Sequence, residues 1–306
     1  MNRREFLSKI AYGAGAAAIS LTLNPVKILA GEPENNDATY PDLVAVRNGE
    51  PAKLFDKGIE ALGGIGSFVR KGQTVLVKPN IAWAVEPERA GTTNPALLKR
   101  VIESCLEAGA KSVYVFDNTC DHWQDAYSKS TLERTAKEAG AIVAPGHIEG
   151  NFQEVSIPGN VLKSAKVHEL YLSSDVIINL PILKHHGGAS ITAAMKNLMG
   201  VVWDRRFYHR NGLNDCIADF CKFKRPTLNV IDAYKVMSSS GPRGTANSKY
   251  VNHKMIIIST DIVAADAAAA KTFGTEPKNL KYLNQAAESG VGNINLDELR
   301  IQRISL

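Results

Sequence analysis

Apolar segments of strand length alternate with helix-length segments along most of this chain, and that alternation is what most limits its possible folds. The helix-length segments carry start and stop signals, as where Asn94 and Pro95 precede "ALLKRVIESCLE" and Gly109 follows. Strands that are joined through helices form parallel sheets with helices on both faces. The sequence therefore predicts an α/β fold: a mainly parallel sheet flanked by helices in Rossmann-like layers.

One segment departs from this alternation. Between residues 142 and 167, glycines and prolines recur at turn spacing, which predicts short strands or a hairpin rather than another helix. We expect a small β segment appended to the main sheet. The predicted organisation is a single α/β domain over residues 42–306, with an insertion around 142–167, preceded by a polar linker over residues 31–41.

Residues 1–30 carry a different pattern. "NRREFLSK" places Arg3 and Arg4 just before an apolar stretch that is too short for an ordinary membrane-spanning helix. This segment resembles a twin-arginine export signal, which predicts transfer by the twin-arginine export machinery to the periplasm or another extracytoplasmic space. Two outcomes stay open: cleavage after Ala30, and retention of the signal as an amino-terminal membrane anchor.

Charge and cysteine content exclude some classes of protein. Lys and Arg exceed Asp and Glu by 36 − 31 = 5, and residues 1–30 hold three of those excess charges. The remaining chain is too evenly charged for a nucleic-acid binding surface. Its four cysteines match no iron–sulfur spacing, so we expect no cluster of its own, and Cys216 and Cys221 are predicted to be structural, buried thiols.

Polar residues follow five of the predicted strands, at the points where those strands end. They are Lys78 and Asn80, Asp117, Lys184 and His186, Asp232, and Asp261. Because parallel strands bring their carboxyl ends to one edge of the sheet, we expect these side chains to gather in one site.

The residue types suggest how such a site would work. Lysines suit an anionic ligand, whereas aspartates and histidines suit a divalent metal or proton transfer. We predict His186, Asp117 and Lys184 as catalytic residues. The predicted metal ligands are Asp117, Asp232 and Asp261. For Asp261, the alternative that it only caps the following helix stays open.

A long loop over residues 80–94 ends at a helix start, where backbone N–H groups can bind an anion. A second helical segment follows the two glycines after His186. The predicted cofactor-binding residues are Lys78, Asn80, Thr93, Lys196 and Asn197. Two further segments have open roles. The cluster of Arg205, Arg206, His209 and Arg210 belongs either to an anion clamp or to a solvated loop, and the glycine-rich loop after Asp232 could move as a lid.

Six segments together resemble the family known as domain of unknown function 362: "VLVKPN", "TTNPALLKRVIE", "AGAKSVYVFDN", "INLPILKHHGGASITAAMKNLMG", "VIDAY" with "GPRG", and "STDIVAADAAAAKTFG". The resemblance implies an α/β fold and a site at the strand ends, but no reaction. Family members are often joined to ferredoxin-like iron–sulfur segments, and this chain has no such cysteine run.

These observations lead to two hypotheses from different classes. The first is an exported enzyme that acts on a small anionic substrate, with a divalent metal or a phosphate-bearing cofactor at the strand ends. The alternative is a non-catalytic periplasmic protein that binds a metal or cofactor, or serves maturation, for an exported redox partner.

Overall fold

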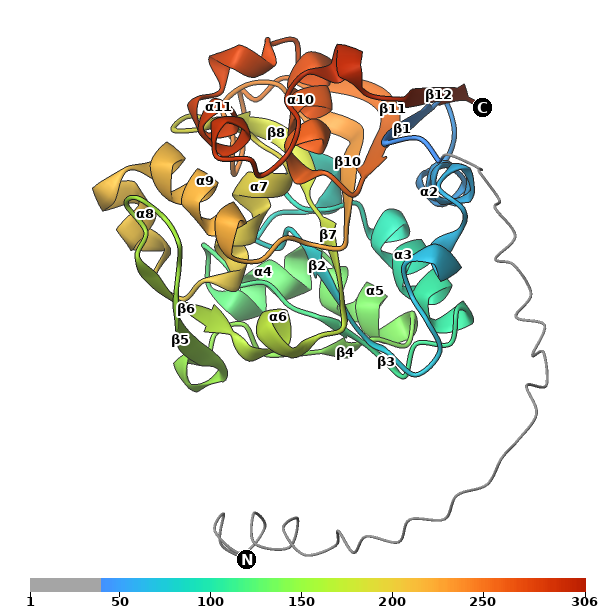
Figure 1. Cartoon of the computed structure of the whole chain (residues 1–306). Helices are drawn as coiled ribbons and strands as arrows, with labels where there is room; N and C mark the ends of the chain where they lie inside the picture. Colours follow the sequence, from blue (N-terminus) through green and yellow to red (C-terminus); the bar gives the residue numbers. More distant parts are fainter. Residues whose placement is uncertain (1–39) are drawn as a thin grey trace, which may run out of the picture. The chain divides into compact units, whose positions relative to one another are not determined.

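A mostly parallel β-sheet runs through the centre of the computed structural model, which describes residues 40–306 (Figure 1). Its strands lie in the order β12-β1-β11-β10-β7-β2-β3-β4, with β8 and β9 attached beside β10. Strands β10, β7, β2, β3 and β4 pair in parallel, and β11 pairs antiparallel with both β10 and β1. The strand bounds are β1 Leu43–Arg47, β2 Thr74–Pro79, β3 Ser112–Val115, β4 Ile142–Val143, β7 Val176–Leu180, β8 Ile182–His186, β9 Ser190–Thr192, β10 Leu228–Met237, β11 Tyr250–Ser259 and β12 Ile301–Ser305.

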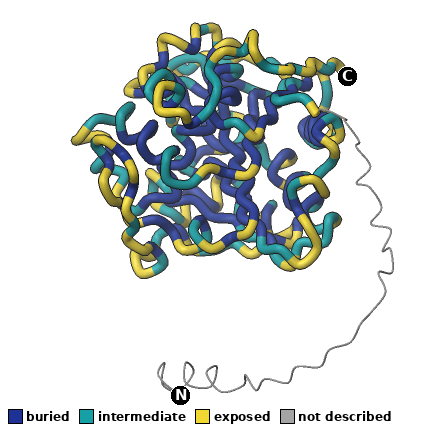
Figure 2. The backbone as a smooth tube through the Cα atoms, viewed as in Figure 1, coloured by how far each residue is buried: buried dark blue, intermediate teal, exposed yellow. Residues whose placement is uncertain are grey.

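Helices cover both faces of this sheet and bury a separate apolar cluster on each face. Helices α2, α3, α4 and α5 pack on one face, and α7, α9, α10 and α11 pack on the other. Figure 2 shows the buried backbone concentrated between these layers. The predicted α/β fold is confirmed. The helix bounds are α2 Pro51–Ala61, α3 Pro95–Glu107, α4 Trp123–Lys129, α5 Leu132–Glu138, α6 Glu169–Ser173, α7 Ala194–Asn197, α8 Arg205–Asn211, α9 Leu213–Phe223, α10 Ile262–Phe273 and α11 Lys281–Glu288.

Local sequence explains where helices α3 and α10 begin. Asn94 caps α3, since its Oδ1 accepts hydrogen bonds from the backbone N–H groups of Ala96 and Leu97. Asp261 caps α10 in the same way, accepting from Val263 N at 2.8 Å. Asn94 ends the loop that follows β2. Asp261 follows β11, which runs antiparallel to β10 and therefore ends at the opposite edge of the sheet.

The small appended β segment is also present. Strands β5 (Phe152–Ser156) and β6 (Ser164–His168) form an antiparallel pair separate from the main sheet. The preceding strand β4 joins the edge of the main sheet instead, parallel to β3. The insertion therefore begins only after β4.

The stretch after Pro181 differs from the expectation that Lys184 and His186 follow the end of a strand. The chain continues as β8, which no longer pairs with β2 but stays parallel beside β10, the other neighbour of β7. Proline has no N–H to donate, which ends the ladder of β7, while its carbonyl accepts from Asp232 N at 2.9 Å. Lys184 and His186 are therefore held on a strand. The two glycines form the turn into β9.

Two sequence-based predictions concern the amino terminus. The export signal and most of the linker lie outside the described residues. Within residues 40–306, none of the helices has the length and apolar character needed to cross a membrane.

Candidate functional site

A pocket of about 410 Å³ lies beyond the carboxyl ends of β2 and β3. It is bordered by β8, α7 and α8, and by the loops that follow β2 and β3. Seven of the predicted site residues line it: Lys78, Asn80, Asp117, Lys184, His186, Lys196 and Asn197. The structure thus brings together groups from four separate parts of the sequence.

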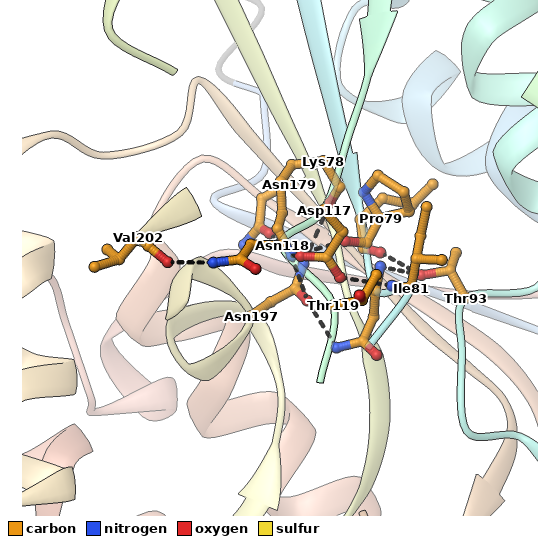
Figure 3. A network of polar contacts seen from close by, with 12 residues as sticks. Lys78, Pro79, Ile81, Thr93, Asp117, Asn118, Thr119, Asn179, Asn197 and Val202 are labelled. Atoms are coloured by element: carbon orange, nitrogen blue, oxygen red, sulfur yellow. Dashed lines mark hydrogen bonds and ion pairs between the residues drawn. The ribbon is translucent and has the colours of Figure 1, made fainter. Parts of the chain in front are cut away.

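A buried ion pair forms the floor of this pocket. Lys78 Nζ lies 2.8 Å from Asp117 Oδ1, and both side chains are almost fully buried (Figure 3). Lys78 Nζ also donates to Pro79 O at 2.8 Å and to Asn197 Oδ1 at 3.1 Å. Asp117 Oδ2 accepts from Ile81 N at 2.6 Å. Burial lowers the pKa of Lys78 and the Asp117 carboxylate opposes that shift, so the two charges compensate each other.

The polar contacts continue through two amides to Lys184. Asn80 Nδ2 donates to Asn197 Oδ1 at 2.9 Å, and Asn197 Nδ2 donates to Asn179 Oδ1 at 2.8 Å. Lys184 Nζ donates to Asn80 Oδ1 at 3.1 Å and to the carbonyl oxygen of Gly91. These acceptors are neutral. Burial therefore dominates and lowers the pKa of Lys184 to about 7.

Lys196 projects from the short helix α7 and is half-buried. Within residues 40–306, no acceptor or carboxylate contacts its Nζ. Burial is the main cause that lowers the pKa of Lys196 to about 8, and the positive charges of Arg205 and Lys78 add to it. Arg205 itself is fixed by the Thr119 carbonyl and by Cys120 Sγ, 3.1 Å from its Nη1.

His186 is oriented by the turn that follows it. Its Nδ1 accepts from Gly188 N at 3.1 Å and from Ala189 N at 3.0 Å, so the neutral ring carries its proton on Nε2. Burial, with repulsion from Lys196 and Lys184, lowers the pKa of His186 to about 3. At neutral pH the imidazole is therefore an uncharged donor. His185 faces elsewhere, its Nδ1 accepting from Gly241 N.

The pocket is strongly electropositive. Its lining contains five Lys or Arg side chains against one carboxylate, that of Asp117. Since Asp117 is paired with Lys78, four basic groups remain without a countercharge among the described lining residues: Lys184, Lys196, Arg205 and Arg206. Such a lining attracts and holds small anions.

Three predicted site residues do not line the pocket. Thr93 Oγ1 accepts from Asn80 N and donates to Leu180 O, which fixes the start of the loop rather than a ligand. The Asp232 carboxylate is buried and accepts from Asn94 N and Tyr234 N. Asp261 caps α10 and also accepts from Asn293 N at 2.7 Å.

The predicted metal ligands are consequently not brought together. In the part of the chain that the structure describes, no group of three or more His, Cys, Asp or Glu side chains is placed to hold a metal ion. Each of Asp117, Asp232 and Asp261 instead accepts from backbone N–H groups. The donor set at this pocket, amines, guanidinium groups and amides, does not fit a divalent cation.

Other lining residues were missed or left open by sequence reasoning. Trp83 and Cys120 come from the loops after β2 and β3, and only loop position could have indicated them. Two roles stayed open for Arg205, Arg206, His209 and Arg210. The first three line the pocket and Arg210 does not. Pro242, from the glycine-rich loop after β10, reaches the same lining.

The fold and the pocket define a class: an α/β protein with a cationic pocket beyond the carboxyl ends of its parallel strands. Within that class the chain belongs to the family described as domain of unknown function (DUF362), whose model matches residues 75–271.

A curated relative is a thylakoid-associated protein of Synechocystis sp., 26% identical over 235 residues that cover 72% of each chain. Among solved structures, the lactate racemase apoprotein of Thermoanaerobacterium thermosaccharolyticum is 11% identical with a TM-score of 0.47, covering 74% of this chain and 56% of that one. A protein of Thermotoga maritima is 11% identical with a TM-score of 0.45, covering 78% and 60% respectively. This chain thus spans less than two thirds of either solved structure.

Proposed function

We propose that this protein is an enzyme that acts on a small anionic molecule held in the cationic pocket. The observation that carries the proposal is the pairing of Asp117 with Lys78, which leaves the other basic groups of the described lining without a carboxylate partner there. A volume of about 410 Å³ suits a small molecule. Arg205 and Arg206 offer planar donors that match carboxylate or phosphate oxygens.

Lys184 and His186 are the groups best suited to catalysis. A lysine with a pKa of about 7 can both give and take a proton at neutral pH. The neutral His186 ring can donate an Nε2–H hydrogen bond to an oxygen on which negative charge develops. Asp117 acts on this arrangement indirectly, because it holds Lys78 and the backbone N–H of Ile81.

A phosphate-bearing cofactor fits the same cationic groups, with Lys196 and Asn197 on α7 and Lys78 and Asn80 at the end of β2 as its candidate contacts. The metal alternative loses support because the carboxylates do not converge. A non-catalytic carrier of an anionic cofactor for an exported redox partner remains the second candidate. It predicts ligand binding without turnover.

We place this activity outside the cytoplasm, at the periplasmic side of the membrane, on the basis of the twin-arginine pattern at Arg3 and Arg4. The export machinery would then be its first partner. This part of the proposal is independent of the pocket.

A thermal-shift panel tests the proposed ligand class. The protein should be stabilised by phosphate and by malonate but not by their uncharged analogues, dimethyl malonate and trimethyl phosphate. Lys184→Met should lose most of that stabilisation, whereas the matched surface variant Lys166→Met should keep it, because Lys166 is exposed and pairs with Glu149. Equal shifts in both variants would show that the anions act elsewhere.

A further inference from the structure

We propose that Lys196 forms an imine with the substrate, which makes that substrate a small carbonyl compound carrying a carboxylate or a phosphate. This inference rests on the proposed function, because it names the chemistry that the same pocket performs. It concerns one amine among the three lysines of the lining, and the contacts of these three lysines distinguish them.

Two of the three amines are already held by acceptors. Lys78 Nζ contacts Asp117, Pro79 O and Asn197 Oδ1, and the residue is fully buried in the pocket floor. Lys184 Nζ donates to Asn80 Oδ1 and to Gly91 O, and only 1% of the surface of this residue is exposed. A bound carbonyl carbon would have to displace these contacts to meet either amine.

Lys196 is the third amine, and it differs from the other two. It lies on the pocket wall, keeps partial exposure, and has no acceptor among residues 40–306 to fix its Nζ. Asp266 anchors the start of its helix, accepting from Ala194 N and from Met195 N at 3.2 Å. Among the described residues, no hydrogen bond therefore holds the tip of this side chain, while the start of its helix is fixed.

The surroundings favour the uncharged amine that such a reaction needs. Burial and the neighbouring charges of Arg205 and Lys78 lower the pKa of Lys196 to about 8, so an appreciable fraction is neutral near pH 7. A desolvated lysine beside other cations is a recognised way to produce an amine nucleophile. The same cations would hold the anionic end of the substrate.

The reaction balances without any redox partner. The lone pair of the neutral Lys196 amine attacks the carbonyl carbon and gives a carbinolamine. The carbonyl oxygen then leaves as one water molecule, taking both amine protons, and a C=N bond remains. The His186 Nε2–H is available as a hydrogen-bond donor to that oxygen while it carries negative charge.

Reductive trapping tests this assignment. The purified protein is incubated with sodium cyanoborohydride and either pyruvate or glyceraldehyde 3-phosphate, and the adducts are mapped by peptide mass spectrometry. We expect one predominant adduct per chain, on Lys196, with at least tenfold more label there than on any other lysine. The preferred reagent of the two shows whether a carboxylate or a phosphate is recognised. Lys196→Arg should lose this adduct, and Lys166→Arg should keep it.

Each other outcome overturns the proposal. Label spread evenly over surface lysines, label on Lys184 instead, or no label with either reagent would each show that Lys196 forms no imine. Because mapping is done on the unmodified sequence, an unfolded variant does not decide the test. The thermal shift with malonate distinguishes failure of this inference from failure of the proposed function. If malonate stabilises the protein but no adduct is trapped, only the imine is disproved. If malonate does not stabilise the protein, the proposed function is disproved as well.

Discussion

Lys78 Nζ lies 2.8 Å from Asp117 Oδ1. This contact connects the carboxyl end of β2 with the segment that follows the neighbouring strand β3. Because Asp117, the only carboxylate of the described lining, is paired with Lys78, it does not compete with an anionic ligand for the other basic side chains. A buried pair costs desolvation, and loss or displacement of one partner is strongly destabilising because the other charge is left buried and unpaired. Its integrity therefore determines both the local fold and the charge of the pocket.

Gly200 lies against this pair and leaves no room for a side chain, so we expect Gly200→Ala to disrupt it. An added Cβ would lie 1.8 Å from Asp117 Oδ1 and 2.7 Å from Lys78 Nζ. Overpacking of this kind costs about 1–3 kcal/mol, and we predict that loss in the free energy of unfolding measured with urea. Gly150→Ala is the control, because nothing lies within 4 Å of its added Cβ. Equal stability of the two variants would show that the pair tolerates displacement.

Asp232 should make stability depend on pH. Burial raises its pKa to about 6, so the folded state binds its proton more tightly than the unfolded state does. The stability from that proton is fully present below about pH 4 and is lost as the pH rises through about 6. We predict that Asp232→Asn removes about 2–3 kcal/mol of this pH-dependent change. Urea unfolding at several pH values measures it. Parallel profiles for wild type and variant would contradict the assignment.

Anion binding should weaken as the pH rises. Lys184, with a pKa of about 7, and Lys196, with one of about 8, are cationic only below those values. Sulfate keeps its charge across this range, so its affinity should fall by about tenfold or more between about pH 6 and pH 9. In Lys184→Met, the part of this fall in sulfate affinity that occurs near pH 7 should be absent. An affinity for sulfate that does not change with pH would show that these amines do not face the ligand.

Cys120 is the exposed cysteine of the pocket, whereas Cys105, Cys216 and Cys221 are buried. One thiol per native chain should therefore react with alkylating reagents. Iodoacetate is an anion and iodoacetamide is neutral, so the surrounding positive charge should favour alkylation by iodoacetate. We expect the ratio of the two alkylation rates to be about tenfold higher for Cys120 than for the thiol of glutathione. Phosphate should slow the labelling. The same ratio as for glutathione would mean that Cys120 does not sense the charge of the pocket.

Cys216 and Cys221 lie buried in α9, and burial raises the pKa of Cys216 to about 11. We predict that replacing both by Ala lowers the free energy of unfolding by about 1–3 kcal/mol and leaves phosphate binding unchanged. Urea unfolding and calorimetry measure the two quantities. Lost binding in a folded double variant would give these thiols a role at the site.

Export forms a separate prediction, since it rests on residues outside the described part of the chain. Changing Arg3 and Arg4 together to Lys should leave the protein in the cytoplasm, as fractionation and immunoblotting would show. Unchanged export would remove the twin-arginine interpretation.

The sequence alone was sufficient for the layers and for seven of the residues that line the pocket. Strand ends such as Lys78 and Asp117 could be predicted to meet, because parallel strands bring their carboxyl ends to one edge. The same rule failed for Asp232, which lies within β10 rather than at its end, and for Asp261, because β11 runs antiparallel to β10 and therefore ends at the opposite edge of the sheet. Both carboxylates accept hydrogen bonds from backbone N–H groups, Asp232 from Asn94 N and Asp261 from Val263 N. The position of Arg205 depended on how α8 packs, which no local pattern reveals.

Calorimetric titration with inorganic phosphate at low ionic strength tests the central claim most directly. We compare the wild-type protein with Lys184→Met and with the exposed control Lys166→Met. The account predicts one site per chain, with the affinity lowered about tenfold or more in Lys184→Met and unchanged in Lys166→Met. No measurable binding to the wild type, or the same dissociation constant for all three proteins, would contradict a pocket built to hold a small anion.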